Sequence, residues 1–219
     1  MQQPIRTKKL AVLAMLSALA YLLMVAIRIP VVLFLKYEPK DVIIVIGGFL
    51  FGPLAAFTMS VIVSFVEMFT VSDTGWIGYV MNIVSTCSFA CVAAFIYKIN
   101  RSIKGAVIGL VAGSLCVTAV MMLWNYFLTP IYMGMPREAV AELLIPYFLP
   151  FNLLKSGINS AFTVLLYKPL GNALRKSRLM PAYENANTVK GKINISAMLV
   201  SCFVLITCVL LFLVLQGRI

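Results

Sequence analysis

Long apolar stretches dominate the sequence and restrict the chain to folds that bury them in a lipid bilayer. Six such stretches cover residues 9–27, 42–70, 76–97, 104–128, 146–168 and 194–215. A hydrocarbon core about 30 Å thick is crossed by about 20 helical residues, so the stretches are long enough to span it. With 62% hydrophobic and only 11% charged residues, the chain also lacks the charged surface of a soluble globular domain. We therefore expect an all-α polytopic membrane protein.

The second stretch is too long for one span and contains a helix-breaking pair near its middle. Gly52 precedes Pro53, whose ring clashes with the preceding helical turn and whose nitrogen carries no proton. We predict a short helix over 42–52 and another over 54–70, joined by a tight turn, which gives seven membrane helices in total. Asp41 stands immediately before the short helix and is well placed as its N-cap.

The positive charge, formally +11, is unevenly distributed over the loops, and cytoplasmic loops of membrane proteins are enriched in Lys and Arg. If the N-terminus lies inside the cell, 12 of the 18 basic residues flank inner helix ends, five flank outer ends, and Lys155 lies within a span. The bias predicts a multi-pass protein with a cytoplasmic N-terminus, and basic residues in these positions indicate topology rather than nucleic-acid binding. The inner set is Arg6, Lys8, Lys9, Lys98, Arg101, Lys104, Lys168, Arg175, Lys176, Arg178, Lys190 and Lys192, and the outer set is Arg28, Lys36, Lys40, Arg137 and Arg218.

Histidine is absent from the chain, which excludes histidine-ligated metal sites and histidine acid–base catalysis. The five cysteines, Cys87, Cys91, Cys116, Cys202 and Cys208, all lie within apolar stretches and form no CxxC pair. Free cysteines of this kind are usually small buried packing residues. We therefore expect neither a metal site nor a cofactor.

One ionisable side chain stands out at membrane depth, where a charge costs about 2.5–3.5 kcal/mol on insertion scales and marks a candidate functional site. Lys155 lies about ten residues into its span. At helical spacing, Asn152, Ser156 and Asn159 share one broad face with it. This face of the helix is the strongest candidate for a binding site.

Three further polar residues, Asn125, Asn82 and Glu67, fall in the outer half of other spans. An amide presents both a donor and an acceptor, so two amides and an ammonium can bind the edge of a flat heterocycle with alternating acceptors and donors. The alternative for Asn82 and Asn125 is that they satisfy backbone carbonyls between helices.

Small residues at four-residue spacing predict close helix packing, either within the bundle or with a partner. Gly105, Gly109 and Gly113 form one such seam, for which packing inside the bundle is the default interpretation. Ala14 and Ala18 form another on the first helix, whose apolar residues run all round it. Spacing alone leaves open whether this alanine pair faces the bundle or an external partner.

The first outer loop, residues 28–41, is long enough to act as a lid over the bundle mouth. Its segment LKYEPKD (35–41), together with IGGFLFGPL (46–54), resembles the first-loop and second-helix signature of riboflavin-specific S components of energy-coupling factor (ECF) transporters. NLLK (152–155), followed by Asn159 and the pair Tyr167-Lys168, is similar to that family's last shared helix. Ala14 and Ala18 match the AxxxA element of its first helix. The resemblance covers about residues 8–176.

The resemblance implies a six-helix S-component bundle over residues 1–176, in a prokaryotic cell membrane, with a substrate site near the outer face. Riboflavin or a close flavin is implied as the transported ligand, not as a cofactor. The positions that match the family's binding residues are Leu35 through its backbone, Asn125, Asn152 and Lys155, with Glu38, Glu67 and Asn82 as secondary candidates. Ala14 and Ala18 would contact the transmembrane coupling subunit of a separate module that also contains two ATPase subunits.

The chain departs from this pattern at its C-terminal end. It continues with a polar linker, 177–193, and an additional C-terminal transmembrane helix within 194–219. The apolar part of that helix carries no ionisable residue, so we predict a role in packing or anchoring and no contact with the site.

Two other classes of function are an enzyme and a self-sufficient secondary transporter. No G-x4-GK-[ST] phosphate loop occurs in the sequence, so ATP hydrolysis is expected from partners and the chain is predicted not to be an enzyme. An intramembrane hydrolase would need a nucleophile with a base or a metal. A self-sufficient secondary transporter of a small aromatic solute would need a buried acid for H⁺ or Na⁺, and Glu67 is the only real candidate. We predict a high-affinity riboflavin-binding subunit of an ECF vitamin transporter, with the secondary transporter as the alternative.

Overall fold

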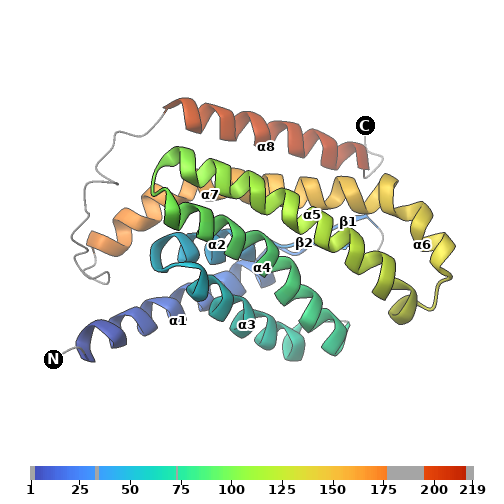
Figure 1. The fold of residues 1–219 in the computed structure, drawn as a ribbon, viewed down its shortest axis with the longest axis horizontal. Helices are drawn as coiled ribbons and strands as arrows, with labels where there is room; N and C mark the ends of the chain where they lie inside the picture. The colour runs from blue at the N-terminus through green and yellow to red at the C-terminus, as the bar shows by residue number, and fades with distance from the viewer. Residues whose placement is uncertain (1–2, 33–34, 73, 177–194, 216–219) are drawn as a thin grey trace.

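The computed structural model describes residues 3–32, 35–72, 74–176 and 195–215, which form a bundle of helices with one small hairpin (Figure 1). The N-terminal half contains α1 (Gln3–Ala26), β1 (Ile29–Val32), β2 (Leu35–Tyr37), α2 (Lys40–Phe51), α3 (Pro53–Thr70) and α4 (Gly75–Ile99). The C-terminal half contains α5 (Ile103–Met133), α6 (Arg137–Leu143), the π-helical turn η1 (Leu144–Phe148), α7 (Leu149–Lys176) and α8 (Ile195–Leu215). The predicted linker at 177–193 lies outside the described residues.

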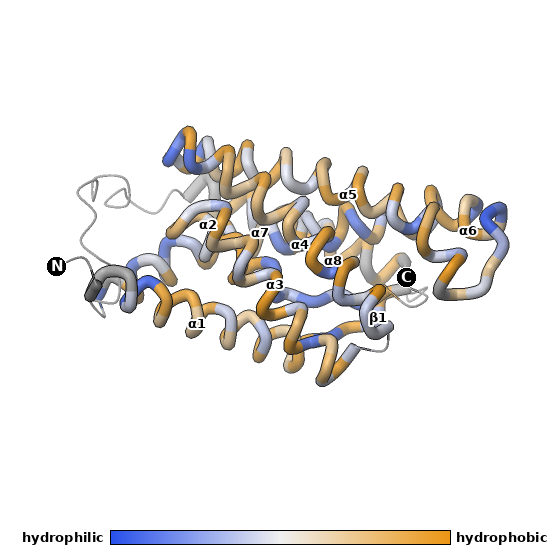
Figure 2. Tube along the Cα trace, turned by 60° about the horizontal axis from the view of Figure 1, so that its bottom comes forward, coloured by the Kyte–Doolittle hydropathy of each residue, from blue (hydrophilic) through white to orange (hydrophobic). Residues whose placement is uncertain are grey.

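Helices α1, α3, α4 and α5 have the length and composition of membrane spans, whereas the described parts of α7 and α8, at the predicted spans 146–168 and 194–215, do not meet both criteria. Among the described residues, four segments qualify by both criteria, namely Thr7–Ala26, Pro53–Thr70, Gly75–Ile99 and Ile103–Ile131. Figure 2 shows that hydrophobic residues dominate these helices, while the most hydrophilic stretches lie largely at helix ends, such as the start of α1 and the region of α6. The prediction of a helical membrane fold is confirmed.

The predicted break between the second and third helices is present at Gly52 and Pro53. Gly52 adopts a φ of 95°, a conformation that favours glycine, and Pro53 occupies the first turn of α3, where its missing proton leaves no hydrogen bond unmade. The resulting α2 has only 12 residues, about 18 Å at 1.5 Å per residue, and is too short to cross a bilayer alone. It is buried from Lys40 to Phe49, so it forms the centre of the bundle.

The predicted N-cap is wrong. The residue that precedes α2 is Pro39, and no side chain caps the helix there. Asp41 lies within the first turn instead, and its carboxylate accepts hydrogen bonds from α4 and α7. Asp41 therefore connects α2 to two other helices and does not cap its own helix.

The first outer loop contains regular structure that the sequence analysis did not predict. β1 and β2 pair antiparallel, with Ile29 opposite Tyr37 and Val32 opposite Leu35. The register is irregular between Pro30 and Val32, as expected beside a proline that cannot donate to the ladder. Tyr37, the last residue of β2, and Glu38, which follows it, are both buried.

The glycine seam on α5 packs against α4, within the bundle. A Cβ atom at Gly109 would lie 2.7 Å from the Ala93 carbonyl oxygen, and one at Gly113 would lie 2.6 Å from that of Phe89. Such distances leave no room for a side chain, so glycine is required for the two backbones to approach this closely. The predicted internal packing of this seam is confirmed.

The alanine pair on α1 faces away from the bundle. Val12, Leu16 and Ala20 are buried on the inner side of the helix, whereas Ala14 and Ala18 are exposed. The face is therefore free for lipid or a partner, and partner contact remains a prediction.

The additional helix α8 runs along α7 (Figure 1). Its Leu205 and Cys208 pack against a buried cluster formed by Val31, Tyr37, Phe151, Leu154 and Ile158. One residue of this cluster, Phe151, lines the cavity described below, whereas no described residue of α8 does. The helix therefore packs behind the site, and its role in packing or anchoring stays a prediction.

Candidate ligand-binding site

A cavity of about 340 Å³ lies between the hairpin and helices α3, α4, α5 and α7. This volume falls within the usual range for small-molecule sites, about 300–1,000 Å³. All seven residues that the sequence analysis selects as ligand-binding candidates line it: Leu35, Glu38, Glu67, Asn82, Asn125, Asn152 and Lys155. The structure thus brings together groups from five separate segments. That they bind a ligand remains a prediction.

The two central amides are held by their own helices. Asn125 on α5 donates from Nδ2 to the carbonyl of Met121 at 2.7 Å and accepts from Thr129 Oγ1 at 3.0 Å. Asn152 on α7 donates to the carbonyl of Phe148 at 2.7 Å. Each amide donates to a carbonyl four residues earlier and not to a neighbouring helix: that of Asn125 stays within α5, and that of Asn152 reaches the last residue of η1. These bonds fix both side chains while using one proton of each NH₂ group, and an amide has two.

Lys155 is held beside a carboxylate that the sequence analysis interprets only as a helix cap. Its side chain is 15% exposed, and Nζ lies 3.7 Å from Asp41 Oδ2. Asp41 is itself buried and accepts from Thr86 Oγ1 at 2.7 Å and from Asn159 Nδ2 at 3.3 Å. Tyr37 of the hairpin donates to Asn159 Oδ1 at 3.0 Å. The hairpin and the inner wall of the cavity are therefore part of one hydrogen-bonded network.

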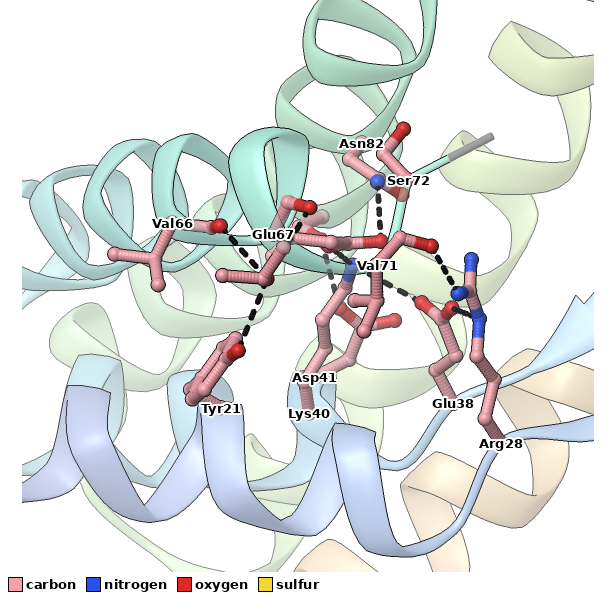
Figure 3. A network of polar contacts seen from close by, with 12 residues as sticks. Tyr21, Arg28, Glu38, Lys40, Asp41, Val66, Glu67, Val71, Ser72 and Asn82 are labelled. Atoms are coloured by element: carbon pink, nitrogen blue, oxygen red, sulfur yellow. Dashed lines mark hydrogen bonds and ion pairs between the residues drawn. The ribbon is translucent and has the colours of Figure 1, made fainter. Parts of the chain in front are cut away.

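A second network links four cavity-lining residues, Arg28, Glu38, Glu67 and Asn82, through Lys40 (Figure 3). Arg28 donates from Nε to Glu38 Oε1 at 3.0 Å and also bonds the carbonyl of Val71. Lys40 lies 3.0 Å from Glu38 Oε2 and forms a further ion pair with Glu67. Asn82 donates to the other oxygen of Glu67 at 2.9 Å. This network fixes the base of the hairpin to the ends of α3 and α4.

Lys40 is the residue that sequence reasoning places wrongly. The charge distribution assigns Lys40 to the outer loops, but its side chain is 1% exposed in the structure. A usable signal is present in the sequence, because the neighbouring acids Glu38 and Asp41 and the buried candidate Glu67 all require positive counter-charges. Arg28, counted with it, lines the cavity.

The electrostatic environment of the hairpin follows from these contacts. Burial alone would raise the pKa of Glu38, but the ammonium of Lys40, assisted by that of Lys155, outweighs this effect and holds the pKa below its usual value. Burial, together with the carboxylate of Asp41, raises the pKa of Tyr37. Glu38 is therefore ionised and Tyr37 protonated at neutral pH, as their hydrogen bonds require.

Comparison with known proteins identifies the family. Residues 8–167 match the family described as ECF transporter, substrate-specific component. The chain belongs to this family. The riboflavin transporter RibU of Staphylococcus aureus (strain TCH60) is 30% identical over 182 residues, which cover 78% of this chain and 94% of that relative. The riboflavin transporter FmnP of Bacillus subtilis (strain 168) is 26% identical, with 79% and 97% covered.

A solved structure agrees with this assignment. The S component of a bacterial ECF transporter has a TM-score of 0.65 and 30% identity to this chain, and the match covers 78% of this chain and 99% of the solved one. The family match ends at residue 167, within α7. In this S component, helix α8 therefore lies outside the matched region, although it packs against the hairpin side of the site.

The cysteines of the S component are all free thiols. The prediction that they are buried is wrong for Cys202, which is exposed, and the other four are half-buried. Cys91 donates weakly to the carbonyl of Pro53 at 3.6 Å. Among the residues that the structure describes, no three His, Cys, Asp or Glu side chains gather as metal ligands would.

Proposed function

We propose that this S component binds riboflavin, or a close flavin, in the 340 Å³ cavity and presents it for uptake by an ECF transporter. One observation carries the proposal: Asn125, Asn152 and Lys155 converge on a single cavity from two helices of a chain whose family is that of substrate-specific ECF components. The relatives named as riboflavin transporters support the choice of ligand.

The geometry suits the polar edge of the isoalloxazine ring. That edge alternates carbonyl acceptors with a ring N–H donor, and an amide offers both a donor and an acceptor, whereas an ammonium offers only donors. Lys155 donates to a ring acceptor, and the amides of Asn125 and Asn152 complete the pattern. The backbone of Leu35 contacts the ligand from the hairpin, which covers the site.

We further propose that uptake is energised from outside the chain. A transmembrane coupling subunit and two ATPase subunits would supply the energy, and the exposed face of α1 at Ala14 and Ala18 would contact the coupling subunit. The distribution of Lys and Arg supports a cytoplasmic N-terminus. The chain then acts as a transport subunit rather than an enzyme, with residues 1–176 as the binding bundle, 177–193 as a linker and 194–219 as an anchoring helix.

Riboflavin binding to the purified protein tests the proposal, because bound flavin loses its fluorescence when it stacks in a site. Lys155→Ala and Asn152→Ala should each weaken binding by about tenfold or more, since a buried group left without its partner costs about 1–3 kcal/mol. Lys176→Ala and Asn172→Ala, at exposed positions near the end of the same helix, serve as matched controls. Absence of binding at micromolar riboflavin would exclude the ligand, and unchanged affinity in both site variants would exclude this cavity.

A further inference from the structure

We infer that Asp41 is a positioning residue that holds the ammonium of Lys155 in place for the ligand. The inference rests on the proposed function, in which Lys155 contacts the ligand directly. Lys155 lines the 340 Å³ cavity and also a second cavity of about 10 Å³, which Asp41 lines as well. Lys155 thus lines the ligand cavity, and its ammonium nitrogen lies 3.7 Å from Asp41 Oδ2.

The carboxylate of Asp41 is fixed independently of Lys155. Thr86 on α4 donates to Oδ1 at 2.7 Å, and Asn159 on α7 donates to Oδ2 at 3.3 Å. Asn159 is held in turn by the hydroxyl of Tyr37, at 3.0 Å. Because α2, α4, α7 and the hairpin all contribute to this arrangement, the negative charge has a fixed position behind the ligand cavity.

The distance between the two charges indicates how Asp41 acts. A direct hydrogen bond between an ammonium and a carboxylate is about 2.7–2.9 Å long, whereas Nζ of Lys155 lies 3.7 Å from Oδ2. Asp41 thus attracts the ammonium without forming a direct hydrogen bond to it, which leaves the protons of Nζ available to a ligand. A lysine side chain has high rotamer entropy, and holding it in place before binding lowers the cost of ordering it later.

A double-mutant cycle on riboflavin affinity tests this role, because only a residue that acts through Lys155 loses its effect when Lys155 is removed. The variants are Asp41→Asn, Lys155→Met and the charge-balanced double variant, each in the full chain. We expect Asp41→Asn to raise the Kd about tenfold, equivalent to about 1.4 kcal/mol. The double variant should bind within twofold of Lys155→Met alone. Glu142→Gln, an exposed carboxylate on α6, is the matched control and should leave the Kd unchanged.

Two additional measurements keep the test decisive if Asp41→Asn alone does not fold. Thr86→Val preserves the charge but removes a bond that holds Asp41, and should raise the Kd less, again only when Lys155 is present. The infrared carbonyl bands of bound riboflavin should shift in the same direction in Thr86→Val or Asp41→Asn as in Lys155→Met, since each weakens the same ligand contact. A purely structural role of Asp41 would leave these bands unchanged.

The outcomes separate the inference from the proposed function. If Lys155→Met weakens binding and Asp41→Asn raises the Kd by the same factor with or without Lys155, the positioning role is refuted while the ligand site stands. The same conclusion follows if Asp41→Asn folds and binds riboflavin normally. If Lys155→Met itself binds riboflavin normally, the proposed site fails and the inference fails with it.

Discussion

Replacing Lys40 with methionine removes the ammonium that two buried carboxylates share. Lys40 lies 3.0 Å from Glu38, forms an ion pair with Glu67, and is 1% exposed. Removing one partner of a buried ion pair costs about 3–5 kcal/mol. Glu38 keeps the bond from Arg28 and Glu67 keeps that from Asn82, so we expect the lower end, about 3 kcal/mol. At about 2–4 °C per kcal/mol, Lys40→Met should lower the melting temperature by roughly 6–12 °C.

Thermal unfolding of the purified, ligand-free protein, followed by intrinsic fluorescence, measures this shift. Lys98→Met, which removes an exposed lysine from the last turn of α4, controls for the loss of one positive charge. The double variant Lys40→Met/Glu67→Gln removes one charge of each sign and should be more stable than Lys40→Met alone. A melting temperature within about 1 °C of the original protein, or a double variant less stable than the single one, would refute the reasoning.

Two further predictions concern helix surfaces. Ala14→Trp places an indole on the exposed face of α1. Riboflavin affinity should stay within twofold, whereas uptake should be abolished in cells that contain the ATPase module. Persistent uptake would argue against this face as the coupling surface. Gly109→Leu forces α5 away from the Ala93 carbonyl, 2.7 Å from the added Cβ, and should destabilise the protein by about 1–3 kcal/mol in thermal unfolding. Val111→Leu, on the exposed face of the same helix, should be neutral, and equal melting temperatures for the two variants would contradict the close-packing argument.

The sequence predicted the parts of this structure that depend on local rules. The break at Gly52 and Pro53 follows from the chemistry of those two residues, and the glycine seam of α5 from the spacing of its glycines. Asn125, Asn152 and Lys155 were identifiable because polar groups are conspicuous in apolar spans. Their convergence on one cavity depends on how α5 and α7 pack, which the family resemblance implied but local pattern did not.

The features that the sequence did not predict are contacts between residues far apart in the chain and strands too short to show a pattern. Asn159 is hydrogen-bonded to Tyr37, 122 residues earlier, and to Asp41, 118 residues earlier. No helical or strand periodicity relates residues so far apart in the chain. The hairpin strands have only four and three residues, fewer than an alternating pattern needs to be recognised. Lys40 and Asp41 stand at the start of a helix, where charges usually serve as caps or loop charges, and only the packing of α2 at the centre of the bundle buries them.

The placement of the buried acids also bears on how transport is energised. Each of the three acids at the site has a lysine close by: Glu38 and Glu67 pair with Lys40, and Asp41 with Lys155. A carboxylate with an ammonium already beside it gains little from binding Na⁺, because the added cation is repelled by the one already present. Glu67, the residue on which an ion-driven transporter would depend, is therefore occupied as a structural counter-charge. This arrangement favours a subunit that binds its substrate without ion exchange and relies on a separate module for energy.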